Sequence, residues 1–325
     1  MSISIVIATY NRAALLCECL RHLADQRFEA EDEVVVVDNG SADDTPRTIE
    51  VSRQRFPVRL RHLTESRPGK SHALAAAVTA AKGDVLAFTD DDVTVDPLWL
   101  GTIRRIMRDS DAALVGGPVF PRWEEAPPSW LRFETAEFSR LAAPLGLLNY
   151  GPISLELGPR TVLGSNMAVR RAPINKVGGF ARHLGKLRGT LQSGEDHELC
   201  QRVQAAGYSA VYCPELRVVH WVPAERMRAT YSMSWFFWSG ITQATFDAVE
   251  RGWPALTGGV PPHFFRRAFM SSIRGIGAAV RGQPVQVMDR ATEVAFIAGY
   301  TARRWGVRGG EKGMNGVPVQ RKVAE

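Results

Sequence analysis

The sequence predicts an α/β fold in which a mainly parallel central sheet is flanked by helices. Short, almost wholly apolar segments alternate with amphipathic or alanine-rich segments up to about residue 120. Strands that are apolar on both faces are typical of parallel sheets covered by helices. The 325-residue chain is 45% hydrophobic and 23% charged, which is enough to bury a large core.

The first strand is predicted at residues 2–10, SISIVIATY, which is apolar and rich in β-branched residues. Asn11 is expected to cap the following helix. The apolar residues of that helix recur with the helical period, at Leu15, Leu16, Cys19, Leu20 and Leu23.

The alternation then continues through five further elements. A second strand with turn residues after it is predicted within 32–45, DEVVVVDNGSADDT, and a helix over 44–55. A third strand is predicted over 58–65. The alanine-rich segment 71–81 favours a helix by propensity, and 84–92, DVLAFTDDD, predicts a fourth strand.

Beyond residue 120 the pattern becomes less regular. The Pro- and Trp-rich segment 121–131 is expected to be a loop near the site, and 164–171 a strand. Residues 194–207 predict an amphipathic helix with acidic residues at its start, where they complement the helix dipole. Residues 208–221 predict two short strands around a turn that contains proline.

Carboxylates gather at the predicted carboxyl ends of the strands, which is where α/β sheets bind ligands. Asp90, Asp91 and Asp92 follow one apolar strand, and Asp38 ends another. Three adjacent carboxylates can bind a hard divalent cation and leave positions open for substrate phosphates. An acidic surface turn is the alternative.

The net charge of +6 is concentrated in the C-terminal part. From Arg226 onward there are 14 Lys and Arg against 6 Asp and Glu. Segments 227–246 and 264–282 also combine aromatic residues with arginine, which suits amphipathic helices on an anionic membrane better than nucleic-acid binding. Packing on the remainder of the chain or in a dimer is the alternative.

Three regions are therefore expected: a catalytic domain at 1–225, a helical extension at 226–308 and a disordered tail at 309–325. The N-terminus lacks a signal-peptide pattern, and no run of about 18 apolar residues occurs. A cytoplasmic location is expected, with peripheral contact at the inner face of the membrane as an option.

Six segments occur in the order and at roughly the spacing typical of family 2 glycosyltransferases: IVIATYNR, VVVVDNGSADDT, GKSHAL, AKGDVLAFTDDD, GSNMAVRR and GEDHELCQRV. The chain resembles this family over about residues 3–221. The resemblance implies the GT-A fold and an inverting transfer from a nucleotide-sugar to a glycan or lipid-linked acceptor. It favours a UDP-sugar over GDP- or dTDP-linked donors.

The resemblance also implies roles in donor binding. Thr9 and Asn11 would line the nucleotide pocket, and Asp38 would accept a hydrogen bond from a uracil-type base. Arg67 and Lys70 would approach the base or the diphosphate. Asp38 as a turn-former and Lys70 as a solvated lysine are the alternatives.

By the same resemblance, Asp90 and Asp91 contribute to the donor site, with Asp90 on the ribose or on a metal-bound water. Asp92 would ligate Mg²⁺ or Mn²⁺, which neutralises charge on the departing diphosphate. Asp90 and His220, in VVHW, complete the implied ligand set. A structural role for a buried histidine is the alternative.

The second acidic cluster has a different implied task. Asp196 would be the general base that removes the proton of the acceptor hydroxyl, with Glu195 and His197 positioning the base or the acceptor. Asn166 would contact the sugar or the acceptor. The alternative for Glu195 and Asp196 is a helix start at which acidic residues are favourable. The alternative for Asn166 is a side-chain amide in a turn.

Two other functions remain to be weighed. Nucleotidyltransferases that make sugar nucleotides share the layout but carry a glycine-rich loop after the first strand, and ATYNRAALL has no glycine. A catalytically inactive, membrane-bound adaptor that binds glycan or nucleotide would not need both acidic clusters.

Overall fold

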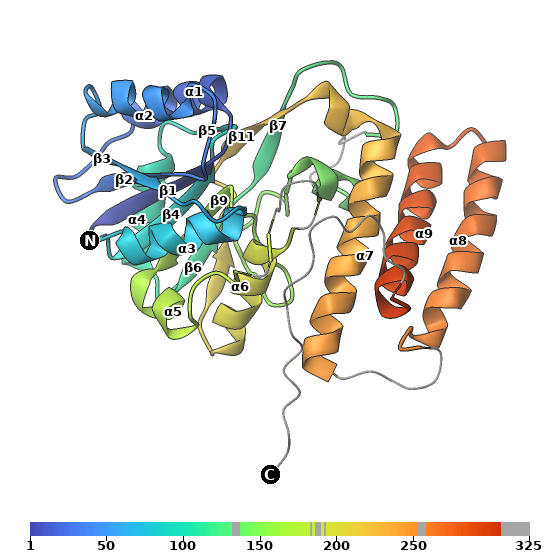
Figure 1. Cartoon of the computed structure of the whole chain (residues 1–325). Helices are drawn as coiled ribbons and strands as arrows, with labels where there is room; N and C mark the ends of the chain where they lie inside the picture. Colours follow the sequence, from blue (N-terminus) through green and yellow to red (C-terminus); the bar gives the residue numbers. More distant parts are fainter. Residues whose placement is uncertain (132–136, 183, 186–189, 192, 252–257, 307–325) are drawn as a thin grey trace, which may run out of the picture.

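The computed structural model describes residues 1–131, 137–182, 184–185, 190–191, 193–251 and 258–306. Figure 1 shows a sheet flanked by helices, with the long helices of the C-terminal part set beside it. The predicted tail at 309–325 lies outside the described residues.

The main sheet has eight strands in the order β3-β2-β1-β4-β9-β6-β10-β8. The four strands β1 to β4 are parallel to one another, while β9 runs antiparallel to both β4 and β6. Their bounds are Ile3–Thr9 (β1), Glu33–Asp38 (β2), Arg59–Thr64 (β3), Val85–Asp90 (β4), Leu114–Gly116 (β6), Leu155–Glu156 (β8), Asn166–Arg170 (β9) and Ala210–Tyr212 (β10).

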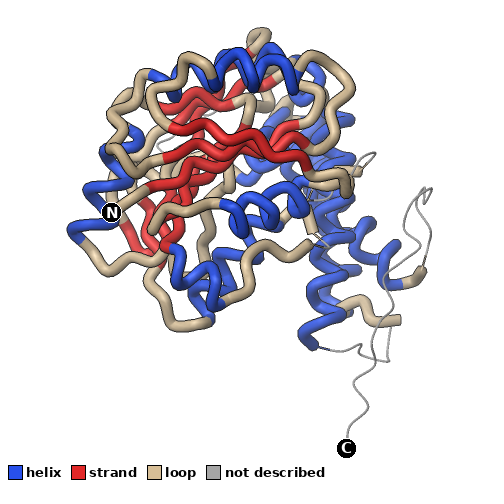
Figure 2. Tube along the Cα trace, turned by 60° about the vertical axis from the view of Figure 1, so that its left-hand side comes forward, coloured by secondary structure: helices blue, strands red, loops and turns tan. Residues whose placement is uncertain are grey.

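Helices cover both faces of this sheet, as Figure 2 shows from the side. Alternate residues of β1 divide between the two cores: Ile5 packs with one helical layer and Val6 with the other. One layer contains α1 (Ala13–Ala24), α2 (Thr45–Arg53) and α4 (Trp99–Asp109), and the other α3 (Lys70–Ala80), α5 (Arg171–Lys176) and α6 (Glu195–Ala205).

A second, three-stranded sheet explains how distant polar residues meet. It consists of β5 (Val93–Val95), β11 (Val218–Val222) and β7 (Val119–Trp123), in the order β5-β11-β7. Because β5 directly follows the triple aspartate and pairs antiparallel with β11, His220 lies opposite Val93. This pairing brings His220 beside Asp92.

The C-terminal extension consists of α7 (Ala229–Arg251), α8 (Pro262–Val280) and α9 (Pro284–Arg304). In Figure 1, α9 lies between α7 and α8. The α7 and α9 backbones approach closely at Gly240 and Gly299, where a Cβ atom would lie about 2 Å from a carbonyl oxygen of the facing helix. Arg140, in the 3₁₀-helix Arg140–Leu145, donates hydrogen bonds to α9 and so ties the extension to the domain.

The strands and helices predicted before residue 93, and those at 164–171, 194–207 and 208–221, are present with small shifts at their ends. Two expectations were wrong. Asn11 does not cap α1: the helix begins after Arg12, and Asn11 has φ +51° while its Oδ1 accepts the Ala42 N–H at 2.7 Å. Residues 121–123 belong to β7 instead of a loop, because they pair with β11.

Of the helices in the described ranges, none combines the length and the apolar content needed to cross a bilayer.

Candidate active site

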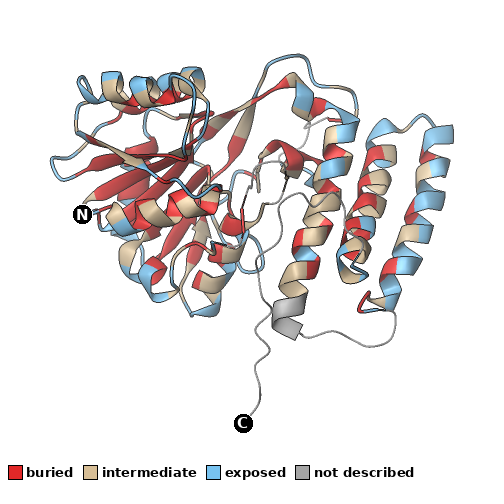
Figure 3. Ribbon diagram, viewed as in Figure 1, coloured by how far each residue is buried: buried red, intermediate tan, exposed pale blue. Residues whose placement is uncertain are grey.

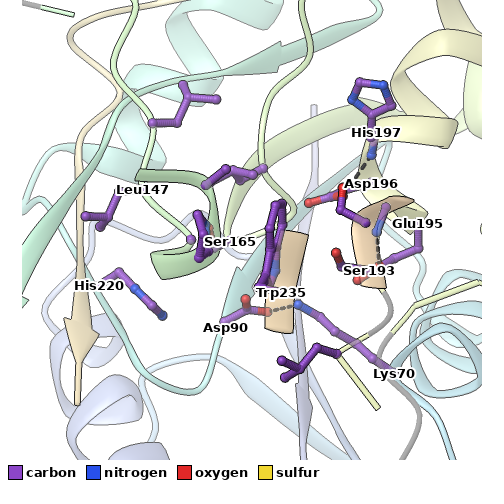
Figure 4. Close-up of a pocket in the computed structure, with 18 of the residues that line it drawn as sticks. Lys70, Asp90, Leu147, Ser165, Ser193, Glu195, Asp196, His197, His220 and Trp235 are labelled. Carbon is purple, nitrogen blue, oxygen red and sulfur yellow. Dashed lines mark hydrogen bonds and ion pairs between the residues drawn. The ribbon is translucent and has the colours of Figure 1, made fainter. Parts of the chain in front are cut away.

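A cavity of about 920 Å³ lies at the carboxyl ends of β1 and β4. Its walls come from these strand ends, the start of α6, strand β11, the segment 143–148 and one face of α7. Both acidic clusters line it, from different elements, as Figure 4 shows for Asp90 and Asp196. The predicted gathering of acids at this edge of the sheet is therefore present.

Each carboxylate of the triple aspartate has its own polar partner. Lys70 Nζ lies 2.5 Å from Asp90 Oδ1, and the Thr9 hydroxyl donates a hydrogen bond of 2.7 Å to Asp91. Arg12 Nη1 lies 3.0 Å from Asp91 and 2.5 Å from Asp92. Part of the positive charge that offsets these acids thus comes from the chain itself.

Within the described residues, Asp92 has more cationic or imidazole partners than Asp90 or Asp91, and these stabilise its ionised form. Besides Arg12, its carboxylate has His220 Nε2 at 3.4 Å and Arg226 at 3.8 Å. Burial by itself would raise the pKa of Asp92, but His220 and the two arginines hold that pKa well below its usual value. Burial and the neighbouring Asp92 charge instead raise the pKa of Asp91 to about 6.

The implied metal-ligand set is only partly assembled. Asp92 Oδ1 and His220 Nε2 are close enough to share an ion, and a carboxylate oxygen with an imidazole nitrogen suits Mn²⁺. Asp90 is instead engaged with Lys70, and within the described residues no three His, Cys, Asp or Glu side chains form a metal cluster. The three-ligand set of Asp92, Asp90 and His220 therefore stays a prediction, of which the structure brings Asp92 and His220 side by side.

The second acidic cluster begins helix α6. Asp196 accepts a backbone N–H from Gly164 at one carboxylate oxygen and from His197 at the other, both at 2.8 Å. These donors fix the orientation of the carboxylate. The His197 ring lies against Thr161 and Gln201, outside hydrogen-bond reach of any acid in the described contacts.

Glu195 is buried beside Asp196 and Lys70. Burial, followed by the Asp196 charge, raises the pKa of Glu195 to about 7, although Lys70 opposes the shift. Lys70 interacts with Asp90, Glu195 and Asp196, so one cation lies between the two acidic clusters. Its own pKa is raised by this surplus of negative charge.

Glu195→Gln should change how stability depends on pH. Because the pKa of Glu195 is raised, its carboxyl stays protonated in the folded protein while the unfolded chain ionises from about pH 4.5 upward. As the pH rises from about 4.5 to 7, the free energy of unfolding of the wild type should therefore decrease by roughly 1–3 kcal/mol more than that of the variant. Urea unfolding of both proteins from pH 4.5 to 8 tests this, and parallel curves would contradict it.

Three predicted donor residues are not part of the cavity wall. Asp38 Oδ1 accepts hydrogen bonds from the Ser41 N–H and hydroxyl, which is the turn-forming arrangement. Arg67 is paired with Glu65 on the surface, and Asn11 holds the loop around Ala42. Their roles in binding a nucleotide base remain predictions. Thr9 and Lys70 do line the cavity.

Asn166 is a core residue. Its Oδ1 accepts the indole N–H of Trp99 at 2.9 Å, and its Nδ2 donates to the carbonyls of Pro118 and Leu216. The side chain is fully buried with its amide engaged and does not line the cavity, so a contact with the sugar or the acceptor remains a prediction. The neighbouring Ser165 lines the cavity instead.

Several cavity residues were not foreseen. Arg12 belongs to the YNR segment after β1. Its position next to a sheet edge rich in carboxylates was the sequence signal that could have placed it in the cavity. Arg226 precedes α7, and that helix contributes Tyr231 and Trp235 to the wall. Trp235 is labelled in Figure 4. Membrane contact and packing on the remainder of the chain were equal alternatives for segment 227–246, and one face of it lines the cavity.

Comparison with known proteins gives a consistent result. Residues 4–178, more than half of the chain, match the family described as Glycosyl transferase family 2. Over 251 residues the chain is 27% identical to the glucosyl-dolichyl phosphate glucuronosyltransferase of Haloferax volcanii, covering 76% of this chain and 78% of that protein. It is 29% identical to the succinoglycan biosynthesis protein ExoM of Rhizobium meliloti over 245 residues, or 74% of each chain.

Among solved structures, the chain is similar to the mannosyltransferase PcManGT from Pyrobaculum calidifontis in complex with GDP-Man and Mn²⁺. The TM-score is 0.64 and the sequence identity 19%, with 94% of this chain and 88% of that one covered. The likeness confirms the GT-A fold predicted from the sequence motifs.

Proposed function

The chain belongs to glycosyl transferase family 2 and is a glycosyltransferase, and we propose that it is an inverting enzyme that uses a UDP-sugar and Asp196 as its general base. The observation that carries this proposal is the single cavity that holds both acidic clusters. The triple aspartate lies at the carboxyl ends of the strands, where α/β sheets bind ligands. Glu195 and Asp196 lie at the start of helix α6, on a separate wall of the cavity.

The reaction forms one bond and breaks another at the anomeric carbon. An acceptor hydroxyl oxygen attacks that carbon on the face opposite the nucleotide, its proton passes to the Asp196 carboxylate, and the nucleoside diphosphate leaves with the bonding electrons. The two backbone N–H donors on Asp196 orient the base but leave lone pairs for the incoming proton.

Fixed cations support departure of the diphosphate. Arg12, Lys70 and Arg226 line the cavity and adjoin the triple aspartate. They are held in place before substrate arrives, so little reorganisation is needed when negative charge develops on the leaving group.

A divalent cation is proposed as cofactor. Asp92 and His220 would hold it, and when bound it would neutralise charge on the leaving diphosphate as a Lewis acid. Mn²⁺ accompanies the nucleotide-sugar in the similar mannosyltransferase structure, which supports the choice of metal. Arg12 and Arg226 would share Asp92 with the ion.

The acceptor is proposed to be a glycan or a lipid-linked sugar that enters beside α7. Tyr231 and Trp235 give this wall an aromatic surface, which suits the apolar face of a sugar ring. A dolichyl phosphate-linked substrate is named for the similar archaeal enzyme, which supports a lipid-linked acceptor here. The enzyme would then act in the cytoplasm at the inner face of the membrane, with residues 1–225 as catalytic domain and 226–308 as extension.

Nucleotide binding tests the proposal. UDP with Mn²⁺ or Mg²⁺ should raise the melting temperature by roughly 3–6 °C at about 100 times Kd, because a ligand of the native state stabilises it. UDP without metal should give a smaller shift, and adenosine monophosphate none. A larger shift with GDP would reassign the donor to a GDP-sugar, and no shift with any nucleoside diphosphate would contradict the proposed site.

A further inference from the structure

Helix α8 carries an apolar stripe on its outer face. Five large apolar residues recur every three or four positions and are 41% to 84% exposed. We call them the outer stripe: Phe265, Phe269, Ile273, Ile276 and Val280. Figure 3 shows the exposed side of α8 facing away from α9 and from the sheet.

Except at Phe265, which stacks on Trp305 at the end of α9, the stripe lies apart from the face that packs. Phe264, Ser271 and Ala278 are the buried residues of α8. Phe264 packs on Tyr300 of α9, and Ser271 donates a hydrogen bond to Glu293 of the same helix. Since α8 is already docked through this face, the outer stripe is not needed to hold the helical unit together.

Basic residues flank the stripe. The α8 sequence, PHFFRRAFMSSIRGIGAAV, contains three arginines and no acidic residue. Arg267 is paired with Glu293, but Arg266 and Arg274 are exposed and make no ion pair within the described part of the chain. Arg281 continues this charge just beyond the helix, and exposed Trp305 stacks on Phe265 at the other end.

We propose that the outer stripe of α8 is a docking face for an anionic bilayer surface. The apolar side chains would enter the boundary between headgroups and acyl chains, and Arg266, Arg274 and Arg281 would meet lipid phosphates. Charge complementarity favours this occupant. A second copy of α8 laid on the stripe would bring further arginines and no carboxylate from that helix.

The docking face goes beyond the proposed transfer reaction and does not depend on it. It also gives the extension two roles on opposite sides: α7 completes the cavity, and α8 contacts the membrane at the far side of the helical unit. The helix would lie along the membrane surface.

Vesicle flotation of the full chain tests the proposal. The wild-type protein should float with phosphatidylcholine vesicles that contain about 30% phosphatidylglycerol, and binding should weaken as salt is raised. Ile276→Asp should weaken binding at least about tenfold. Arg266→Gln combined with Arg274→Gln should weaken it by about tenfold on anionic vesicles only.

Ile153→Asp is the matched control. It makes the same substitution at an equally exposed isoleucine outside α8, 74% exposed against 68% for Ile276, and should leave binding unchanged. Light scattering on each variant reports the oligomeric state. Equal flotation of Ile276→Asp and the wild-type protein would overturn the proposal. It would also be overturned if the wild type is a dimer, Ile276→Asp is a monomer and the two float equally, because the stripe would then be a dimer interface.

Discussion

Asp196→Asn is expected to lower kcat for sugar transfer by about 10²–10⁴-fold, with little effect on the fold. The carboxylate accepts the N–H groups of Gly164 and His197 at different oxygens, and asparagine keeps only one acceptor oxygen, so one of the two hydrogen bonds is lost at a cost of about 1 kcal/mol. Asparagine cannot take the acceptor proton. Nucleotide release, measured with saturating donor and acceptor, reports the loss, and thermal unfolding reports the fold.

Glu198→Gln is the control for this experiment. Glu198 lies on the same helix, but its carboxylate is paired with Arg202 and does not line the cavity. Its kcat should stay within about twofold of wild type, as is usual for changes outside the reacting centre. Wild-type turnover by Asp196→Asn together with an inactive Glu195→Gln would move the base to Glu195. Wild-type turnover by both would contradict the mechanism.

Asp92→Asn is expected to lower turnover by about 100-fold or more and to remove any stimulation by Mn²⁺. The substitution removes the carboxylate that His220, Arg12 and Arg226 share, so it leaves buried positive charge unpaired. A stability loss of about 3 kcal/mol is expected in addition. Initial rates over a range of Mn²⁺ concentrations, with urea unfolding, separate the two effects.

Asp32→Asn is the matched control, because Asp32 is also a buried acid bound to an arginine. It lies 2.6 Å from Arg104 and away from the cavity. We expect it to lose comparable stability and to keep its kcat. If Asp92→Asn stays folded and responds to Mn²⁺ as the wild type does, Asp92 has no part in metal or diphosphate binding.

The parts of the fold that depend on local pattern could be predicted from the sequence. Strands β1, β2 and β4 are short and apolar, and parallel strands end at one edge, so the triple aspartate was expected beside other strand-end groups. Asp196 was assigned from the resemblance of its motif, and it does line the same cavity.

The remaining features depend on contacts between residues far apart in the chain. Asn166 is held by Trp99, Pro118 and Leu216, and no local pattern shows that its amide would be engaged by them. Asp90 is a second example, because its partner Lys70 lies on another element, helix α3. The aromatic segment that begins α7 suits a membrane or a protein wall equally well, and only packing decides which face it presents.

The central claim is that the donor diphosphate lies at the triple-aspartate edge with its sugar directed toward Asp196. The most direct test is a crystal structure of the full chain with UDP and Mn²⁺. Density for the diphosphate beside Asp92 and His220, with the cavity open from there to Asp196, is the predicted result. A nucleotide bound outside this cavity, or an Asp196 carboxylate turned away from it, would contradict the account.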